Sequence, residues 1–109
     1  MNLDLNYEGF EEYLIKKIPV PPIMDIFTQC LVDGVHYIFK FENGYGASVI
    51  KGWCTFGYRE DKWELGVIFF DPENPDDYSL AYNTPLTDDV IGYLTDEEVR
   101  ELLGKIKEL

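Results

Sequence analysis

The sequence predicts an α+β fold, an antiparallel meander of about five strands with an N-terminal and a C-terminal helix packed on it. Three observations support this prediction. Apolar and polar residues alternate in short stretches between residues 25 and 84. Asp-Gly and Asn-Gly dipeptides, which favour tight hairpin turns, separate some of these stretches. Residues 95–109 show helical apolar spacing behind a capping sequence. The chain of 109 residues fits one domain, with a helix and connector at 1–24, the sheet at 25–84 and a helical segment at 85–109.

A short helix from Glu8 to Ile18 is expected at the N-terminus, with Phe10 and Leu14 on its apolar face. The run Pro19–Pro22 would end this helix, because proline lacks a backbone donor and disfavours helix in the residue before it. The run would adopt a polyproline II conformation and connect the helix to the sheet. A ligand for a proline-binding domain is the alternative interpretation of this connector.

Two strands are expected over residues 25–32 and 35–41, joined by a tight turn at Asp33-Gly34. Such a turn would place Val32 opposite Val35. The register gathers apolar side chains on one face of the hairpin, which is therefore expected to meet the core. In the second strand these side chains are Val35, Tyr37, Phe39 and Phe41.

The glycine-rich stretch FENGYGASVIKG, from Phe41 to Gly52, is predicted to be a hairpin turn rather than a phosphate-binding loop. Asn43-Gly44 favours the positive φ angles of a type I′ turn, and Gly46 allows a bulge or the close approach of another backbone. A phosphate-binding loop would open a helix and carry a Lys-Ser or Lys-Thr pair. Here Val49 and Ile50 favour a strand instead.

Further strands are expected over Trp63–Phe70 and Tyr78–Thr84, with an acidic loop containing two prolines at residues 71–77 between them. Residues 87–92 would form a single capped helical turn that ends at Gly92.

The strongest local signal lies at the C-terminal end of the chain. Thr95–Glu98 matches a capping box, and Leu94 and Val99 flank it as a hydrophobic staple. The apolar residues that follow recur at helical spacing and are expected to cover the sheet. They are Val99, Leu102, Leu103, Ile106 and Leu109.

Charge limits the classes of partner. The chain has 21 acidic and 9 basic residues, and its net charge of −12 repels nucleic acid and anionic membranes and favours basic partners. No secretory signal and no apolar run of about 20 residues is visible, so a cytoplasmic protein is expected. Cys30 and Cys54 are expected to be small buried hydrophobes in a reducing compartment.

The sequence predicts no catalytic residue, no metal and no cofactor. His36 is the only histidine, and spacing pairs no serine or cysteine with it, so a packing or surface role is expected. The acidic loop at residues 71–77 lacks the glycine and the alternate spacing of a calcium loop. A metal-dependent hydrolase that uses this loop is therefore the least favoured class of function.

The segment from Asp71 to Glu98 contains nine acidic residues and no Lys or Arg. Its simplest interpretation is a solvated surface. The alternative is a surface that docks on a basic groove of a partner protein, including a groove that normally holds nucleic acid. The candidate acidic residues are Asp71, Glu73, Asp76, Asp77, Asp88 and Asp89. A second set of candidates is aromatic and surrounds the glycine-rich hairpin: Tyr45, Trp53, Phe56 and Tyr58.

Three stretches also carry a resemblance, namely FKFENGYGAS at Phe39–Ser48, WEL at Trp63–Leu65 and YNTPLTDDVIGYLT at Tyr82–Thr95. In combination, over about residues 35–109, they resemble small uncharacterised proteins encoded by bacteriophages and prophages. The resemblance implies no catalytic residues. It implies a bacterial host cytoplasm as the setting, where small acidic phage proteins often inhibit host machinery, as anti-CRISPR proteins do.

The expected function is therefore that of a non-enzymatic phage accessory protein that binds a host protein and inhibits, for example, a nucleic-acid-handling defence enzyme. The alternative is a structural or assembly-related phage protein whose charge only gives solubility. Exposed edges of a small sheet would also allow a homodimer.

Overall fold

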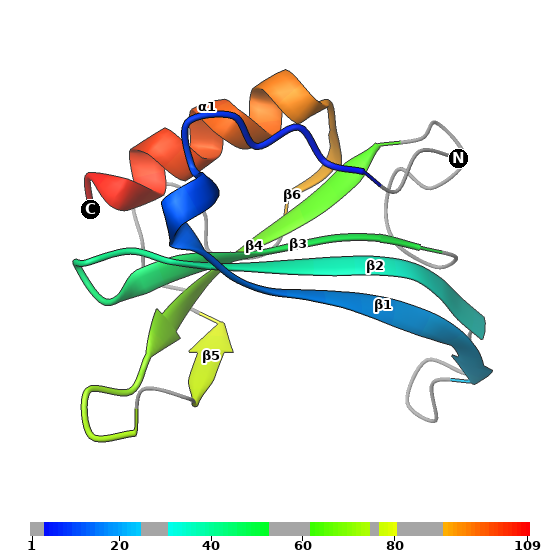
Figure 1. The fold of residues 1–109 in the computed structure, drawn as a ribbon, viewed down its shortest axis with the longest axis horizontal. Coiled ribbons are helices and arrows are strands. Elements are labelled where there is room, and N and C mark those ends of the chain that lie inside the picture. Colours follow the sequence, from blue (N-terminus) through cyan, green and yellow to red (C-terminus); the bar gives the residue numbers. More distant parts are fainter. Residues whose placement is uncertain (1–3, 25–30, 53–61, 75–76, 81–90) are drawn as a thin grey trace.

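The computed structural model describes residues 4–24, 31–52, 62–74, 77–80 and 91–109. In this part of the chain an α-helix lies on one face of a six-stranded antiparallel sheet (Figure 1). The strands are β1 (Leu14–Met24), β2 (Leu31–Lys40), β3 (Tyr45–Gly52), β4 (Trp63–Phe70), β5 (Tyr78–Leu80) and β6 (Ile91–Leu94), and the helix is α1 (Asp96–Lys107).

Strands β1 to β5 follow one another across the sheet in chain order, which confirms the predicted meander and the coarse α+β class. β6 departs from this order and pairs with β4 at Trp63 and Leu65, whereas β5 pairs with the last part of β4, from Ile68 to Phe70. The sheet therefore extends beyond the predicted range of 25–84 at both ends.

The predicted N-terminal helix from Glu8 to Ile18 is wrong. Only Glu11–Tyr13 form a helical turn, of the 3₁₀ type, and β1 begins at Leu14. β1 continues through the proline run, where its register against β2 shifts between Val20 and Ile23. An irregular edge strand accommodates proline, because missing donors there interrupt no inner ladder of the sheet.

The predicted hairpin turn at Asp33-Gly34 is also wrong. Gly34 lies inside β2, paired on both sides with residues of β1 and β3. Val35 accordingly lies opposite Pro19 rather than Val32. Pairing with two long neighbouring strands satisfies many more backbone groups than one local turn does. Residues 25–30, most of the strand predicted before this turn, lie outside the described residues.

The glycine-rich stretch is the predicted hairpin turn, between β2 and β3. The Phe41 N–H donates to the Tyr45 carbonyl at 2.9 Å, and the Gly44 N–H donates to the Phe41 carbonyl at 3.2 Å. Of the three loop residues only Gly44 has a positive φ, 87°, so the turn is not the predicted type I′, which needs two. Gly46 confirms the expected close approach, because a Cβ there would clash with the Phe39 carbonyl oxygen.

The predicted capped turn at residues 87–92 is wrong at its end, because Gly92 lies within β6. Residues 87–90 are outside the described part of the chain. Residues 81–84 of the strand predicted over Tyr78–Thr84 are also outside it, and so are both cysteines. Tyr93 leaves the extended conformation with φ 60° before Thr95 starts the helix.

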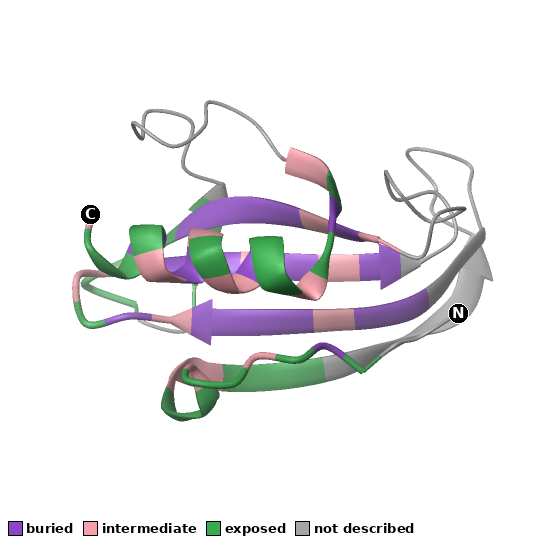
Figure 2. Ribbon diagram, turned by 90° about the horizontal axis from the view of Figure 1, so that it is seen from above, coloured by how far each residue is buried: buried purple, intermediate pink, exposed green. Residues whose placement is uncertain are grey.

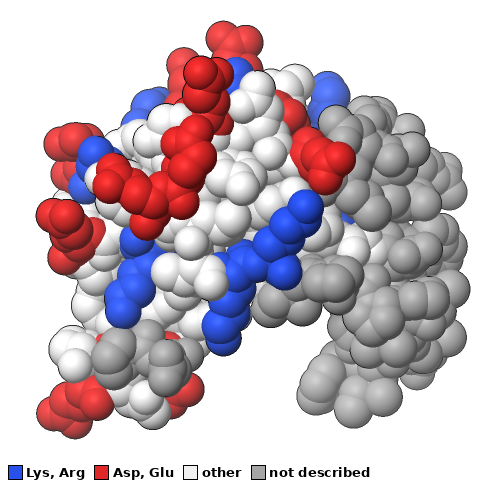
Figure 3. Space-filling model, viewed as in Figure 1, with Lys and Arg blue, Asp and Glu red and all other residues white. Residues whose placement is uncertain are grey.

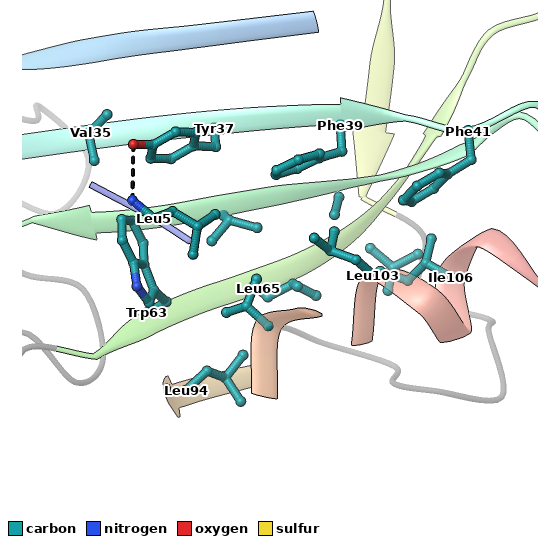
Figure 4. Packing of buried hydrophobic residues seen from close by; sticks show 14 residues of the cluster. Leu5, Val35, Tyr37, Phe39, Phe41, Trp63, Leu65, Leu94, Leu103 and Ile106 are labelled. Atoms are coloured by element: carbon teal, nitrogen blue, oxygen red, sulfur yellow. Dashed lines mark hydrogen bonds between the residues drawn. The ribbon is translucent and has the colours of Figure 1, made fainter. Parts of the chain in front are cut away.

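The main core lies between α1 and the sheet (Figures 2 and 4). The predicted core face of β2 is confirmed, since Val35, Tyr37, Phe39 and Phe41 are all buried. The predicted apolar stripe of the helix is confirmed, but its residues are not equally covered. Val99, Leu103 and Ile106 are buried, while Leu102 and Leu109 are partly buried. A smaller cluster on the opposite face of the sheet consists of Ile38, Ile68 and Phe70.

The start of α1 is attached to the sheet through Asp96. Thr95 forms the predicted capping box with Glu98. Asp96 Oδ1 then accepts a hydrogen bond from the Trp63 indole at 2.7 Å, and its Oδ2 accepts one from the Asn6 N–H at 3.1 Å. One carboxylate thus joins the helix to β4 and to the segment that precedes β1.

Trp63 is fully buried and contacts side chains from β2 and β3. The Tyr37 ring meets it edge-on at 5.6 Å, and Lys51 Nζ lies 4.2 Å from the centre of its ring. Lys51 is itself buried. The attraction between the ammonium and the indole face offsets part of the cost of removing this charge from water.

The end of α1 is attached to the sheet through Asn43. Its Nδ2 donates to the carbonyl oxygens of Ile106 at 2.9 Å, Lys107 at 3.1 Å and Leu109 at 3.2 Å. Its Oδ1 accepts a hydrogen bond from the Tyr45 N–H at 3.0 Å, which fixes the orientation of the amide. The β2–β3 turn therefore caps carbonyls that a helix leaves without partners at its C-terminus.

We expect Leu103→Ala to lower the free energy of unfolding by about 2–5 kcal/mol, because this side chain is fully buried and its removal leaves a cavity. Leu102→Ala is the matched control on the same turn, and its partial burial predicts a loss of roughly 1 kcal/mol. Urea unfolding of both variants measures the difference, and equal losses would contradict the observed orientation of α1.

We expect Asn43→Ala to lower the free energy of unfolding by about 1–2 kcal/mol, because the last carbonyls of α1 lose their donor. The exposed neighbour Glu42 provides the control, since Glu42→Ala changes the same loop without touching the helix. Hydrogen exchange of the amides in the last turn of α1 should accelerate in the first variant only. Unchanged exchange in both would show that Asn43 does not hold the helix.

Candidate functional site

A pocket of about 410 Å³ lies at the hairpin between β4 and β5, away from α1 at the lower end of the view in Figure 1. It combines carboxylates with aromatic and apolar side chains. Its lining residues are Phe69, Asp71, Pro72, Asp77, Tyr78 and Ser79.

The loop above the pocket is closed by its own hydrogen bonds. The Asp71 N–H donates to the Asp77 carbonyl at 3.0 Å, so these two residues face each other at the base of the loop. Asp71 Oδ1 accepts from the Glu73 N–H at 2.9 Å, and Asp77 Oδ2 accepts from the Asn74 amide at 2.9 Å. The other oxygen of each carboxylate has no hydrogen-bond partner among the described residues, and each is available for a ligand.

Two aromatic side chains of the pocket are unusually exposed, Phe69 at 38% and Tyr78 at 39%. The Tyr45 ring packs edge-on against Phe69, with ring centres 5.1 Å apart. Gly44 allows this packing, because a Cβ there would lie 3.2 Å from the Phe69 ring. Tyr78 in turn contacts Phe70, with ring centres 5.4 Å apart.

The structure thus brings together three of the residues that the sequence offered as separate candidates. Asp71 and Asp77 line the pocket, and Tyr45 borders it through Phe69. Glu73 is exposed outside the pocket and orients Asp71 through its backbone. The remaining candidates lie outside the described residues: Asp76, Asp88, Asp89, Trp53, Phe56 and Tyr58.

Sequence reasoning missed four lining residues: Phe69, Pro72, Tyr78 and Ser79. A signal for two of them was present, because Phe69 and Tyr78 are large aromatic residues that flank the acidic loop. Their exposure could not be read from the alternating pattern, which places Phe69 on the same face as the buried Leu65 and Val67.

The acidic residues of the segment 71–98 that the structure describes form two groups. Asp71, Glu73 and Asp77 lie at the β4–β5 loop, whereas Asp96, Glu97 and Glu98 lie at the start of α1 on the other side of the sheet (Figure 1). Figure 3 shows the same division, with Lys and Arg side chains between acidic patches at the top and the bottom of the view. Asp96 and Glu98 stabilise the helix, so the loop group is the better candidate for binding a partner.

His36 does have a serine partner, which the sequence spacing did not indicate. Its Nε2 lies 2.6 Å from Ser48 Oγ across the β2–β3 pair, on the sheet face opposite α1. Burial lowers the pKa of His36 below its ordinary value, so the ring is neutral at pH 7. This contact joins β2 to β3 on that face of the sheet.

Within the described ranges, no three or more His, Cys, Asp or Glu side chains are grouped so that they could hold a metal ion. In the same part of the chain no helix is long and apolar enough to cross a membrane.

Comparison of the chain with protein-family models, with curated proteins and with solved structures gave no match.

We expect stability to fall as the pH drops below about 6.5, because the unfolded His36 then binds a proton that the folded ring resists. This contribution is complete above that pH and is lost toward the lower pKa of the folded state. His36→Gln keeps a polar side chain opposite Ser48 but removes the titration. Urea unfolding between about pH 7.5 and pH 5.5 should therefore show a steeper decline for the wild type, and parallel curves would contradict a buried neutral ring.

Proposed function

We propose that the protein is a non-catalytic accessory protein that binds a basic surface of a partner protein through the β4–β5 pocket. The pocket is the main support for this function, because it places two carboxylates beside exposed aromatic side chains. Aromatic residues supply binding energy in protein interfaces, and complementary charge supplies speed and specificity of association.

The charge around the pocket supports a basic partner. Between Lys62 and Arg100 the sequence contains no Lys, Arg or His. The described ion pair of the structure joins Lys17 to Asp4, far along the chain from the pocket, and none in the described residues involves Asp71 or Asp77. Lys40, whose Nζ lies 5.0 Å from the centre of the Phe70 ring, is outnumbered by Asp71, Glu73 and Asp77, so the net field at the loop attracts cationic groups.

The resemblance to phage-encoded proteins supports a partner in a bacterial host cytoplasm. A nucleic-acid-handling defence enzyme is one class of partner with the required basic surface, and occupation of that surface would inhibit it. Direct binding of nucleic acid is disfavoured by the net charge of −12.

A second copy of the chain is not needed for this function. β1 forms one edge of the sheet, and it carries exposed Lys16 and Lys17 followed by the proline run. Lysine and proline are the residue types that discourage pairing between sheet edges.

One observation favours the alternative, an assembly-related phage protein whose charge only gives solubility. Two residues of the resembling stretches build the attachment of α1, whereas Tyr45 of the same stretches only borders the pocket through Phe69. Asn43 caps the helix, and Trp63 binds Asp96. The resemblance is therefore compatible with a shared fold that serves a different role.

Capture from bacterial lysate tests the proposed function. The wild-type bait is compared with the double variant Asp71→Lys, Asp77→Lys. A control carries the same change of charge at exposed positions of α1 and of the residue that follows it, Glu101→Lys, Glu108→Lys. We expect the wild type and the control to retain the same basic protein and the pocket variant to lose it. Retention should also fall as salt rises from about 0.05 to about 0.5 M, where the Debye length shrinks from roughly 14 to roughly 4 Å. Equal retention by all three baits, indifferent to salt, would contradict this function.

A further inference from the structure

The pocket at the β4–β5 hairpin has the size and chemistry for one cationic side chain. Its volume of about 410 Å³ is at the small end of ligand sites, and it is too small for a folded element of a partner. Asp71 and Asp77 both line it and face each other across the base of the loop. We propose, on the basis of the function proposed above, that this pocket receives the guanidinium group of an arginine side chain of the partner.

The two carboxylates fit a planar cation with several donors. One oxygen of each is already fixed by a hydrogen bond within the loop, which restricts the rotation of Asp71 and Asp77 before any ligand arrives. The remaining oxygens can accept hydrogen bonds from two edges of one guanidinium, which presents five N–H donors in a rigid plane. Preorganised acceptors of this kind reduce the entropy that binding costs.

The aromatic lining favours arginine over lysine. Phe69 lines the pocket and is 38% exposed, and a guanidinium can stack on such a ring while its edges remain free to donate. Tyr78 also lines the pocket, but its ring lies on the other face of the β4–β5 pair, against Phe70. An ammonium group is compact and strongly hydrated, and in a pocket open to water it gains less from an aromatic ring. Tyr45 packs edge-on against Phe69 and limits the movement of that ring.

Among the described residues, no basic side chain forms an ion pair with Asp71 or Asp77. Lys40 is the described basic residue in contact with the β4–β5 hairpin, and its Nζ lies 5.0 Å from the centre of the Phe70 ring. Lys40, Phe70 and Tyr78 share the sheet face that carries Ile38 and Ile68, whereas Phe69 points to the other face. A cation that binds Asp71 and Asp77 beside Phe69 therefore comes from another molecule.

Three blocked tripeptides test the proposal by titration into the whole ¹⁵N-labelled protein: Gly-Arg-Gly, Gly-Lys-Gly and Gly-citrulline-Gly. Citrulline has nearly the shape of arginine without its charge. We expect the arginine peptide to shift the amide signals of residues 69–79, with an affinity about fivefold or more above that of the lysine peptide, since one additional hydrogen bond is worth about this factor. The citrulline peptide should cause no saturable shift.

Matched variants locate the site. Asp71→Asn with Asp77→Asn keeps the shape of the loop and removes its charge, and it should abolish the arginine response. Glu101→Gln with Glu108→Gln changes the net charge equally, at α1 and at the residue that follows it, and should leave the response unchanged. Phe69→Leu should reduce the preference for arginine over lysine. Thermal unfolding of each variant verifies that it is folded.

The outcomes separate this proposal from the broader function. Equal, salt-sensitive binding of the arginine and lysine peptides would overturn the guanidinium site and leave acidic docking intact. Absence of any arginine response, while the lysate partner is still captured through Asp71 and Asp77, would also overturn it. A saturable shift of residues 69–79 by magnesium or calcium that competes with the arginine peptide would reassign the pocket to a metal cation.

Discussion

Attachment of α1 to the sheet at both of its ends is the constraint on which the rest of the structure depends. The helix has 12 residues and spans about 18 Å, so contacts at its two ends fix its direction across the strands. Asp96 holds the first turn through the Trp63 indole, and Asn43 holds the last carbonyls from the β2–β3 turn. The first contact gives the Trp63 indole N–H its acceptor, and the second adds a donor to the last carbonyls of the helix. Between them Leu103 and Ile106 fill the space above the central strands (Figure 4).

The same arrangement leaves the β4–β5 hairpin outside the part of the sheet that α1 covers. α1 and the segment before β1 cover the side of the sheet that contains Tyr37 and Trp63, where Leu5 donates its N–H to the Tyr37 hydroxyl at 3.2 Å (Figure 4). The β4–β5 hairpin extends away from this cover (Figure 1). Its carboxylates contribute little to the core, because charges in an exposed loop have small effects on stability. Asp71 and Asp77 are thus free to serve a partner, whereas Asp96, from the same acidic segment, is committed to the fold.

The candidate site was predicted in part, and the contacts that the sequence did not reveal share one physical reason. The acidic loop was visible because Asp71 and Asp77 stand in one short stretch without basic residues. Tyr45 is distant from this loop in the chain and reaches it only because β3 and β4 pair with Tyr45 opposite Phe69. Ser48 reaches His36 in the same way, through the pairing of β2 with β3. Neighbours of this kind depend on strand register, which no local spacing encodes.

The sequence by itself determined the features that short-range interactions control. The capping box at Thr95 and the turn at Gly44 formed where they were expected, because their hydrogen bonds and φ angles involve residues only a few positions apart. The tertiary structure decided the rest. Leu14–Met24 became an edge strand instead of the end of a helix, because pairing with β2 satisfies its backbone, and Gly34 became the middle of a strand for the same reason. Local propensity is worth a few tenths of a kcal/mol per residue, roughly, and burial of one sheet face under α1 outweighs it.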